Sequence, residues 1–88
     1  MTQRIPGAAD DVASRMAEAI RGALPDAIVE VRPAGPGHFE VRVVAEVFRG
    51  RSRVQQHQLV YAAIAPLMAG DRAPVHAIDA LDTGAPQA

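Results

Sequence analysis

The alternation between His38 and Phe48 is the sequence feature that most constrains how this chain folds. The odd positions are apolar throughout, whereas the even positions between them are mostly polar; the odd set is Phe39, Val41, Val43, Ala45 and Val47. Such alternation is typical of a strand that packs one face on a hydrophobic core. We therefore predict a long strand over residues 38–48, with the odd set facing the core.

A turn and a helix follow this strand. Gly50 closes the predicted turn, and Ser52 is suited to cap the helix because its hydroxyl can accept a hydrogen bond from a free backbone N–H. The helix is expected over residues 52–69, with Pro66 loosening its last turn. Side chains spaced by three or four positions predict its apolar face, namely Val54, His57, Tyr61, Ile64 and Met68. Leu59, Val60 and Leu67 are expected to widen this face.

The first part of the chain predicts a lead-in, a helix and a short strand. Residues 1–9 are expected to be flexible, and Asp10 or Asp11 is the expected N-cap of a helix that runs to Ala23. Its apolar stripe recurs every four residues, at Val12, Met16, Ile20 and Leu24. A short strand is predicted over residues 27–32, and residues 33–37 are predicted to form a turn.

The last part of the chain predicts a third strand over residues 75–81, and residues 83–88 are expected to form a flexible tail. The resulting order is α-β-β-α-β. A strand, a crossover helix and a second strand imply parallel pairing, whereas a short turn implies an antiparallel pair. We therefore predict an α+β fold with a three-stranded mixed sheet and both helices on one face.

Length and composition exclude several classes of protein. The chain has 88 residues, which corresponds to one domain, and Phe39, Phe48 and Tyr61 are the expected largest side chains of its core. The net charge of -1 provides no general attraction for nucleic acid. The absence of cysteine excludes disulfides, thiolate nucleophiles and cysteine-ligated metal sites within the chain. We expect a cytoplasmic protein that does not insert into a membrane.

Four short motifs, in order, resemble the BolA family. The family pattern comprises His-Phe-x-Val, Phe-x-Gly-x-Ser, Arg-His-Arg-x-Val-Tyr and Val-His-Ala. In this chain the corresponding segments are His38-Phe39-Glu40-Val41, Phe48-Arg49-Gly50-Arg51-Ser52, Gln56-His57-Gln58-Leu59-Val60-Tyr61 and Val75-His76-Ala77. The resemblance assigns residues 10–82 to a BolA-like domain and implies a fold similar to a type II KH domain.

The sequence departs from the family pattern at three places. Gln56 and Gln58 replace the arginines that flank the helix histidine. The short loop before His38 lacks the Cys or His that often supplies a cluster ligand in the family. The tail also lacks the usual Thr-Pro-x-x-Trp ending, which suggests a missing or rudimentary C-terminal helix.

The resemblance implies two functions from different classes. BolA-like proteins pair with monothiol glutaredoxins, often through a shared [2Fe-2S] cluster, and others are described as DNA-binding transcriptional regulators. His76 falls at the position of the family's cluster-ligating histidine, and His38 is a candidate to replace the missing loop ligand if it lies near His76. The preferred expectation is a glutaredoxin-binding adaptor with no intrinsic cofactor. DNA binding is the alternative.

Four further residues are candidates for partner or nucleic-acid contact. Arg49, Arg51 and Arg53 form the main basic cluster, which predicts salt-sensitive phosphate binding or attraction of an acidic partner. A solvated turn is the simpler interpretation. His57 lies within the predicted apolar face of the second helix, where its nitrogens are expected to find backbone partners. His57 is therefore either a structural anchor or part of the contact surface.

Catalysis finds little support in the sequence. Ser14 and Ser52 have no evident histidine and carboxylate arrangement, and Asp79 and Asp82 lie at a strand end where carboxylates are usually solvated. We therefore expect a non-enzymatic protein, either a monomer or a weak dimer. A third interpretation is an interaction module that has lost its metal function.

Overall fold

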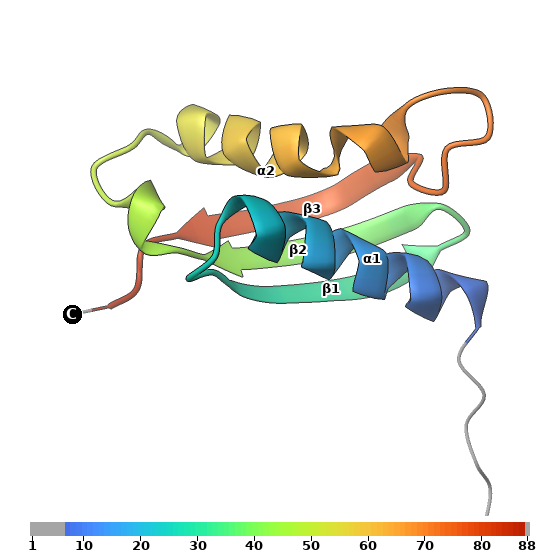
Figure 1. Ribbon diagram of the computed structural model, residues 1–88, viewed down its shortest axis with the longest axis horizontal. Coiled ribbons are helices and arrows are strands. Elements are labelled where there is room, and N and C mark those ends of the chain that lie inside the picture. Colours follow the sequence, from blue (N-terminus) through green and yellow to red (C-terminus); the bar gives the residue numbers. More distant parts are fainter. Residues whose placement is uncertain (1–6, 88) are drawn as a thin grey trace, which may run out of the picture.

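A computed structural model describes residues 7–87 and confirms the predicted α-β-β-α-β order (Figure 1). It adds one short 3-10 helix, η1, between the second strand and the second helix. In chain order the elements are α1 (Ala8–Ala23), β1 (Ile28–Gly35), β2 (His38–Val44), η1 (Glu46–Phe48), α2 (Arg53–Met68) and β3 (Ala77–Gly84).

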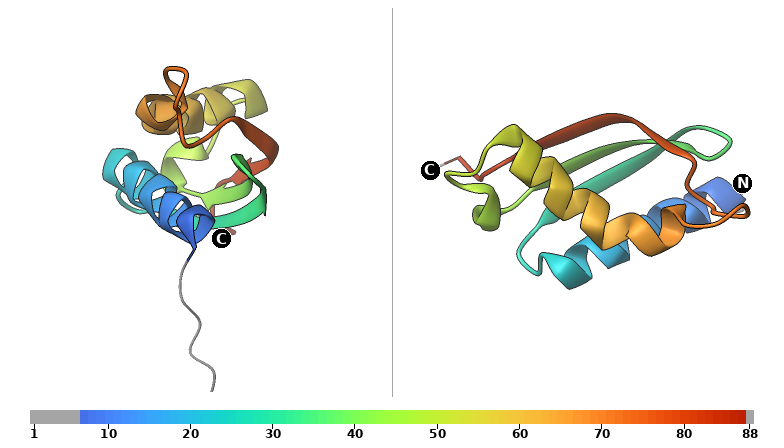
Figure 2. Two further views of the ribbon diagram at one scale, coloured as in Figure 1. Left: turned by 90° about the vertical axis from the view of Figure 1, so that its right-hand side faces the viewer. Right: turned by 90° about the horizontal axis from the view of Figure 1, so that it is seen from above.

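The three strands form one mixed sheet in the order β1-β2-β3. The β1 and β2 strands are antiparallel and β2 and β3 are parallel, so that Val41 pairs with Val31 on one side and with Leu81 on the other. Both helices lie on one face of this sheet and leave the other face open (Figure 2). The predicted α+β class and sheet topology are therefore confirmed.

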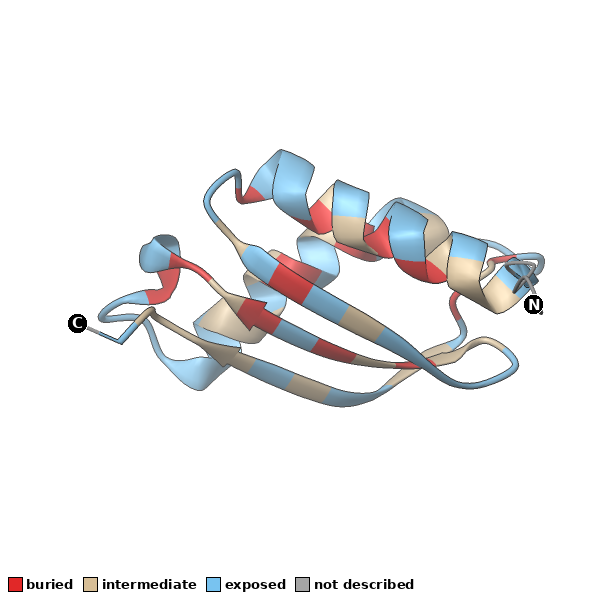
Figure 3. Ribbon diagram, turned by 90° about the horizontal axis from the view of Figure 1, so that it is seen from below, coloured by how far each residue is buried: buried red, intermediate tan, exposed pale blue. Residues whose placement is uncertain are grey.

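The core lies between the central strand and the two helices. Buried positions concentrate on β2, where Phe39, Val41 and Val43 face the helices, while the edge strands are more exposed (Figure 3). The predicted stripe of α1 contributes Met16 and Ile20, which are both fully buried. Burial of large aliphatic and aromatic side chains of this kind stabilises a fold by about 1.5–3 kcal/mol each.

The predicted strand over residues 38–48 ends early, at Val44. The chain then turns through η1, which breaks the two-residue alternation, because successive residues of a 3-10 helix point in directions about 120° apart. As a result Phe48 is fully buried, whereas Val47 is 42% exposed. The prediction that Val47 faces the core is therefore wrong, while the core position of Phe48 is confirmed.

The predicted apolar face of α2 is also partly wrong. Val54 is 65% exposed and Tyr61 is 40% exposed, whereas Val60 and Ile64 are buried. Leu59, Leu67 and Met68 pack partly against the core beside them. The predicted face is therefore right for the residues that pack on the core and wrong for Val54 and Tyr61, because a spacing of three and four fits a wider arc than the packing against the sheet buries.

Several element boundaries differ from the predicted ones. The α1 helix begins at Ala8 with Gly7 as its N-cap, so neither Asp10 nor Asp11 is the cap. Instead, the Gly7 backbone N–H donates a hydrogen bond to Oδ2 of Asp10, at 3.3 Å. The β1 strand extends through Gly35, which shortens the predicted turn. The β3 strand spans Ala77–Gly84, so it begins and ends later than residues 75–81 and includes two residues of the predicted tail.

The start of α2 agrees with the prediction. The Ser52 hydroxyl accepts a hydrogen bond from the Gln55 backbone N–H, and the Ser52 N–H donates to Oε1 of Gln55, both at 3.2 Å. This reciprocal pair satisfies two groups that a helix start otherwise leaves free. Within residues 7–87, neither helix has the length and hydrophobicity that crossing a bilayer requires.

Candidate functional site

The candidate site residues fall at two opposite ends of the sheet. The parallel strands β2 and β3 begin at the same end, which places His38 and His76 there (Figure 1). The basic turn, residues 49–53, follows the other end of β2. A strand of seven residues spans roughly 20 Å, so the two histidines and the basic turn form separate surfaces.

His76 is exposed and its backbone is held firmly in place. Val75, immediately before it, is buried in the core, and Ala77, immediately after it, begins β3. The His76 N–H also donates a hydrogen bond of 2.8 Å to the carbonyl of Gly37 in the β1–β2 turn. Its imidazole makes no hydrogen bond or ion pair with any part of the chain that the structure describes. A fixed backbone therefore presents an accessible imidazole.

His38 lies beside this site but already has a partner. It is the first residue of β2 and pairs in register with Ala77, the residue after His76. Nδ1 of His38 lies 2.8 Å from Oδ1 of Asp79, on the neighbouring strand β3. Because an ionised carboxylate can only accept, Nδ1 donates in this contact, and in the neutral imidazole Nε2 is then the nitrogen with a free lone pair. A carboxylate that orients an imidazole in this way is common beside metal ions.

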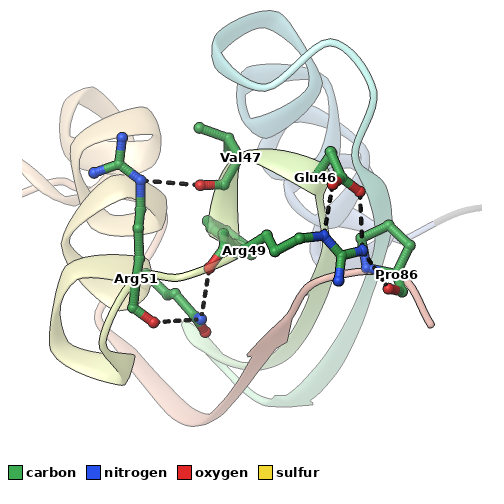
Figure 4. A network of polar contacts seen from close by, with 7 residues as sticks. Glu46, Val47, Arg49, Arg51 and Pro86 are labelled. Atoms are coloured by element: carbon green, nitrogen blue, oxygen red, sulfur yellow. Dashed lines mark hydrogen bonds and ion pairs between the residues drawn. The ribbon is translucent and has the colours of Figure 1, made fainter. Parts of the chain in front are cut away.

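Arg49 is engaged at the opposite end of the sheet (Figure 4). Its guanidinium donates to both carboxylate oxygens of Glu46, at 2.6 and 3.1 Å, and to the carbonyl of Pro86, at 2.7 Å. These hydrogen bonds, together with the positive charge of Arg49, lower the pKa of the Glu46 carboxyl below its ordinary value. Arg49 thus fastens the C-terminal segment to η1, and its charge is compensated locally.

The other two arginines of the basic turn differ from each other. Nε of Arg51 donates a hydrogen bond of 2.9 Å to the carbonyl of Val47, which closes the turn after η1 (Figure 4). Arg53 is the exposed first residue of α2 and has no polar partner among the residues described. Of the three arginines, only Arg53 therefore makes no hydrogen bond or ion pair with residues 7–87.

His57 is partly buried on α2, but its nitrogens do not find the expected partners. Nε2 is enclosed and has no hydrogen-bond partner among residues 7–87. The expectation that both nitrogens of His57 pair with the backbone is therefore wrong for Nε2. An enclosed polar atom without a partner lowers stability by about 1–3 kcal/mol.

Gln56 is a structural residue whose contacts the sequence did not predict. Its Nε2 group donates to the carbonyls of Phe48 and Arg51, both at 3.1 Å, and its Oε1 atom accepts from Oγ1 of Thr83, at 2.7 Å. One amide thus joins α2, the basic turn and β3. The sequence drew attention to this position because a glutamine replaces the arginine of the family pattern. Its hydrogen-bond partners could not be predicted from that replacement, because they lie up to 27 residues away in sequence.

The available ligands limit which metal group the chain can hold. The chain has no cysteine, and within residues 7–87 there is no group of three or more His, Cys, Asp or Glu side chains that could hold a metal ion. One free imidazole, with a second one nearby, cannot complete the four ligands of a [2Fe-2S] cluster. The residues present fit such a cluster only as one or two of its four ligands.

Comparison with known families gives a consistent result. A sequence model described as BolA-like protein matches residues 20–87, a range that includes every candidate site residue considered above. The chain belongs to the BolA family. This confirms the family that the four motifs indicated, and the match includes both His38 and His76.

Individual relatives of this BolA-like chain agree with the family assignment. BolA-like protein 1 of Pongo abelii is 46% identical over 48 residues, which cover 54% of this chain. That match spans only 33% of the curated relative's length. Among solved structures, mouse BolA1 is 32% identical, with a TM-score of 0.72 and coverage of 98% of this chain and 76% of the mouse chain. Arabidopsis thaliana BolA1 is 26% identical, with a TM-score of 0.70 and coverage of 93% and 95%.

Proposed function

We propose that this BolA-like chain is a non-enzymatic adaptor that binds a monothiol glutaredoxin and shares a [2Fe-2S] cluster with it. One observation carries the proposal: a chain without cysteine presents an exposed imidazole, that of His76, on a firmly held backbone. The neutral imidazole is a common ligand for iron, and histidines replace thiolates on one iron of some [2Fe-2S] clusters.

The number of ligands explains why a partner is required. A [2Fe-2S] cluster takes four protein ligands, and thiolates are the usual ones. Here His76 supplies one ligand, so the glutaredoxin and its glutathione supply the thiolates. The chain on its own is therefore expected to hold no cluster, and cluster binding should depend on the complex.

His38 is the second ligand candidate of this proposal. Its free Nε2 atom can bind a metal while Asp79 holds Nδ1, and its strand neighbour Ala77 is adjacent to His76 in sequence. Loss of His38 should therefore weaken the complex less than loss of His76, because His38 is bound to Asp79 whereas the His76 imidazole has no polar partner among residues 7–87. The expected order of the two variants follows from that difference.

Visible circular dichroism tests the proposal. The apo chain is titrated into a cluster-loaded monothiol glutaredoxin, and the spectrum is compared for the wild type, His76→Ala and His38→Ala. We expect the wild type to change the cluster spectrum, His76→Ala to abolish that change and His38→Ala to reduce it. A spectrum that the wild type leaves unchanged, or that His76→Ala changes equally, would remove the proposal.

DNA binding remains the alternative, with less support from the contacts of the basic turn. Glu46 compensates Arg49, and among residues 7–87 neither Arg51 nor Arg53 has a carboxylate partner. One or two phosphate contacts give weak binding that falls quickly with salt. Fluorescence anisotropy with a labelled duplex at low salt tests this alternative, and undetectable binding there would exclude it.

A further inference from the structure

Gly37 and the His76 imidazole pack directly against each other. Gly37 lies in the two-residue turn between β1 and β2, and its carbonyl accepts hydrogen bonds from two successive backbone N–H groups, those of His76 at 2.8 Å and Ala77 at 3.1 Å. The position that a Cβ atom of Gly37 would occupy lies directly beside the ring. The imidazole of His76 therefore packs against the β1–β2 turn.

Any side chain at position 37 would collide with this ring. A Cβ atom built on Gly37 lies 2.8 Å from Cγ, 3.0 Å from Cδ2 and 3.1 Å from Nδ1 of His76. Carbon atoms in favourable contact are about 3.5–4.0 Å apart, so the ring must move if a Cβ is present. The backbone of Gly37 also has a φ of 75°, a region that residues other than glycine adopt rarely.

We infer that Gly37 is a positioning residue that sets the orientation of the His76 imidazole for ligation. This inference rests on the proposed ligand role of His76. It adds that the β1–β2 turn determines the orientation of the His76 imidazole. Gly37 limits the movement of the His76 ring on one side. The backbone of His76 is held by its hydrogen bond to the Gly37 carbonyl and by the buried side chain of the preceding Val75. A ligand held in this way loses little rotational freedom when it binds a metal, which favours binding.

The physical contact can be measured without any partner. Protons that lie over the face of an aromatic ring resonate at unusually high field. We therefore expect the Hα protons of Gly37 to be shifted upfield in the wild type and to return to ordinary positions in His76→Ala. Equal Hα shifts in the two proteins would show that the ring does not rest on Gly37, and the inference would be overturned.

A matched pair of variants separates the effect on the ring from backbone strain. Gly37→Ala introduces both the Cβ collision and the strain of a positive φ. Gly70→Ala introduces the strain alone, because Gly70 has a φ of 88° and a Cβ there meets nothing within 4 Å. The two variants should lose similar thermal stability from strain, but only Gly37→Ala should change the ring 15N and 13C shifts of His76.

The functional consequence is measured by titration with the cluster-loaded glutaredoxin. We expect Gly37→Ala to lower the apparent affinity measured from the His76-dependent change in visible circular dichroism by about tenfold. Substitution of residues that support a metal ligand commonly has an effect of this size. Gly70→Ala should bind as the wild type does. If Gly37→Ala fails to fold, the pair Gly37→Asn and Gly70→Asn replaces it, because asparagine tolerates positive φ better than alanine.

The outcomes distinguish the two levels of the proposal. If His76→Ala changes the cluster spectrum as much as the wild type does, the ligand role fails, and the inference that depends on it fails as well. If His76→Ala abolishes the signal while Gly37→Ala and Gly70→Ala bind equally well, the proposed function stands and the positioning role of Gly37 is wrong. A selective loss in Gly37→Ala supports both.

Discussion

Thr83 in β3 donates a hydrogen bond of 2.7 Å to the side-chain oxygen of Gln56 in the first turns of α2. This contact joins the last strand to the helix that precedes it in sequence. The amide nitrogen of Gln56 donates to the carbonyls of Phe48 and Arg51 on the other side. At the end of the sheet opposite His76, one neutral side chain therefore connects α2, the basic turn and β3.

Replacing Gln56 should destabilise the domain without affecting the histidine site. Gln56→Ala removes three hydrogen bonds and leaves two carbonyls less well satisfied, so we expect a loss of about 1–3 kcal/mol in the free energy of unfolding, measured by urea denaturation. Gln58→Ala, on the exposed side of the same helix, is the control and should change stability by less than about 0.5 kcal/mol. Equal effects of the two variants would contradict this role.

The contrast between Phe48 and Val47 gives a second prediction. Phe48 is fully buried, whereas the adjacent Val47 is exposed. Phe48→Ala should cost about 3–5 kcal/mol, enough to unfold much of a small domain, because it leaves a large cavity. Val47→Ala should cost about 0.5 kcal/mol or less in the same thermal or urea experiment. A larger loss from Val47→Ala would mean that η1 packs differently.

The Glu46–Arg49 pair predicts a pH dependence. Arg49 lowers the pKa of Glu46 in the folded protein, so the ionised carboxylate favours folding. That contribution is fully present above the unfolded pKa of about 4.3 and is lost as the pH falls through the lower folded value. In Arg49→Gln, a carboxyl 13C NMR titration should find the pKa of Glu46 returned toward its ordinary value. The same pKa in both proteins would refute the contact as its cause.

His57 predicts an unusual response to substitution. Its Nε2 atom is enclosed without a polar partner among the described residues. His57→Leu removes that uncompensated nitrogen and keeps an apolar side chain of similar size, so stability should stay the same or rise by about 1 kcal/mol. His57→Ala should lower stability through lost packing. Destabilisation by more than about 1 kcal/mol in His57→Leu would instead support the anchor role.

The sequence was sufficient to predict the order of elements and the family, because both depend on local signals. Alternation through Phe39, Val41 and Val43 identified the central strand, and Ser52 identified the start of α2. The end of that strand was not predictable from alternation alone, since Ala45 continues the pattern into η1. The buried face of α2 was likewise ambiguous, because it depends on packing against the sheet.

The histidine site was predicted in part. The motif around His76 indicated the position of the ligand candidate, but the partners of His38 and the collision distance at Gly37 depend on contacts between strands. Asp79 had been expected to be a solvated strand-end carboxylate, yet it lies 2.8 Å from His38 across 41 residues of sequence. This contact depends on the register between β2 and β3, and no short turn fixes that register because the two strands are joined through η1 and α2.

Pulsed EPR of a reduced cluster tests the central claim most directly. The chain is labelled uniformly with 15N, mixed with unlabelled, cluster-loaded monothiol glutaredoxin and reduced. Our account predicts a strong 15N hyperfine coupling from an imidazole bound to iron, and predicts its loss in His76→Ala. A spectrum without that coupling in the wild type, or with the same coupling in His76→Ala, would contradict the assignment of His76 as a cluster ligand.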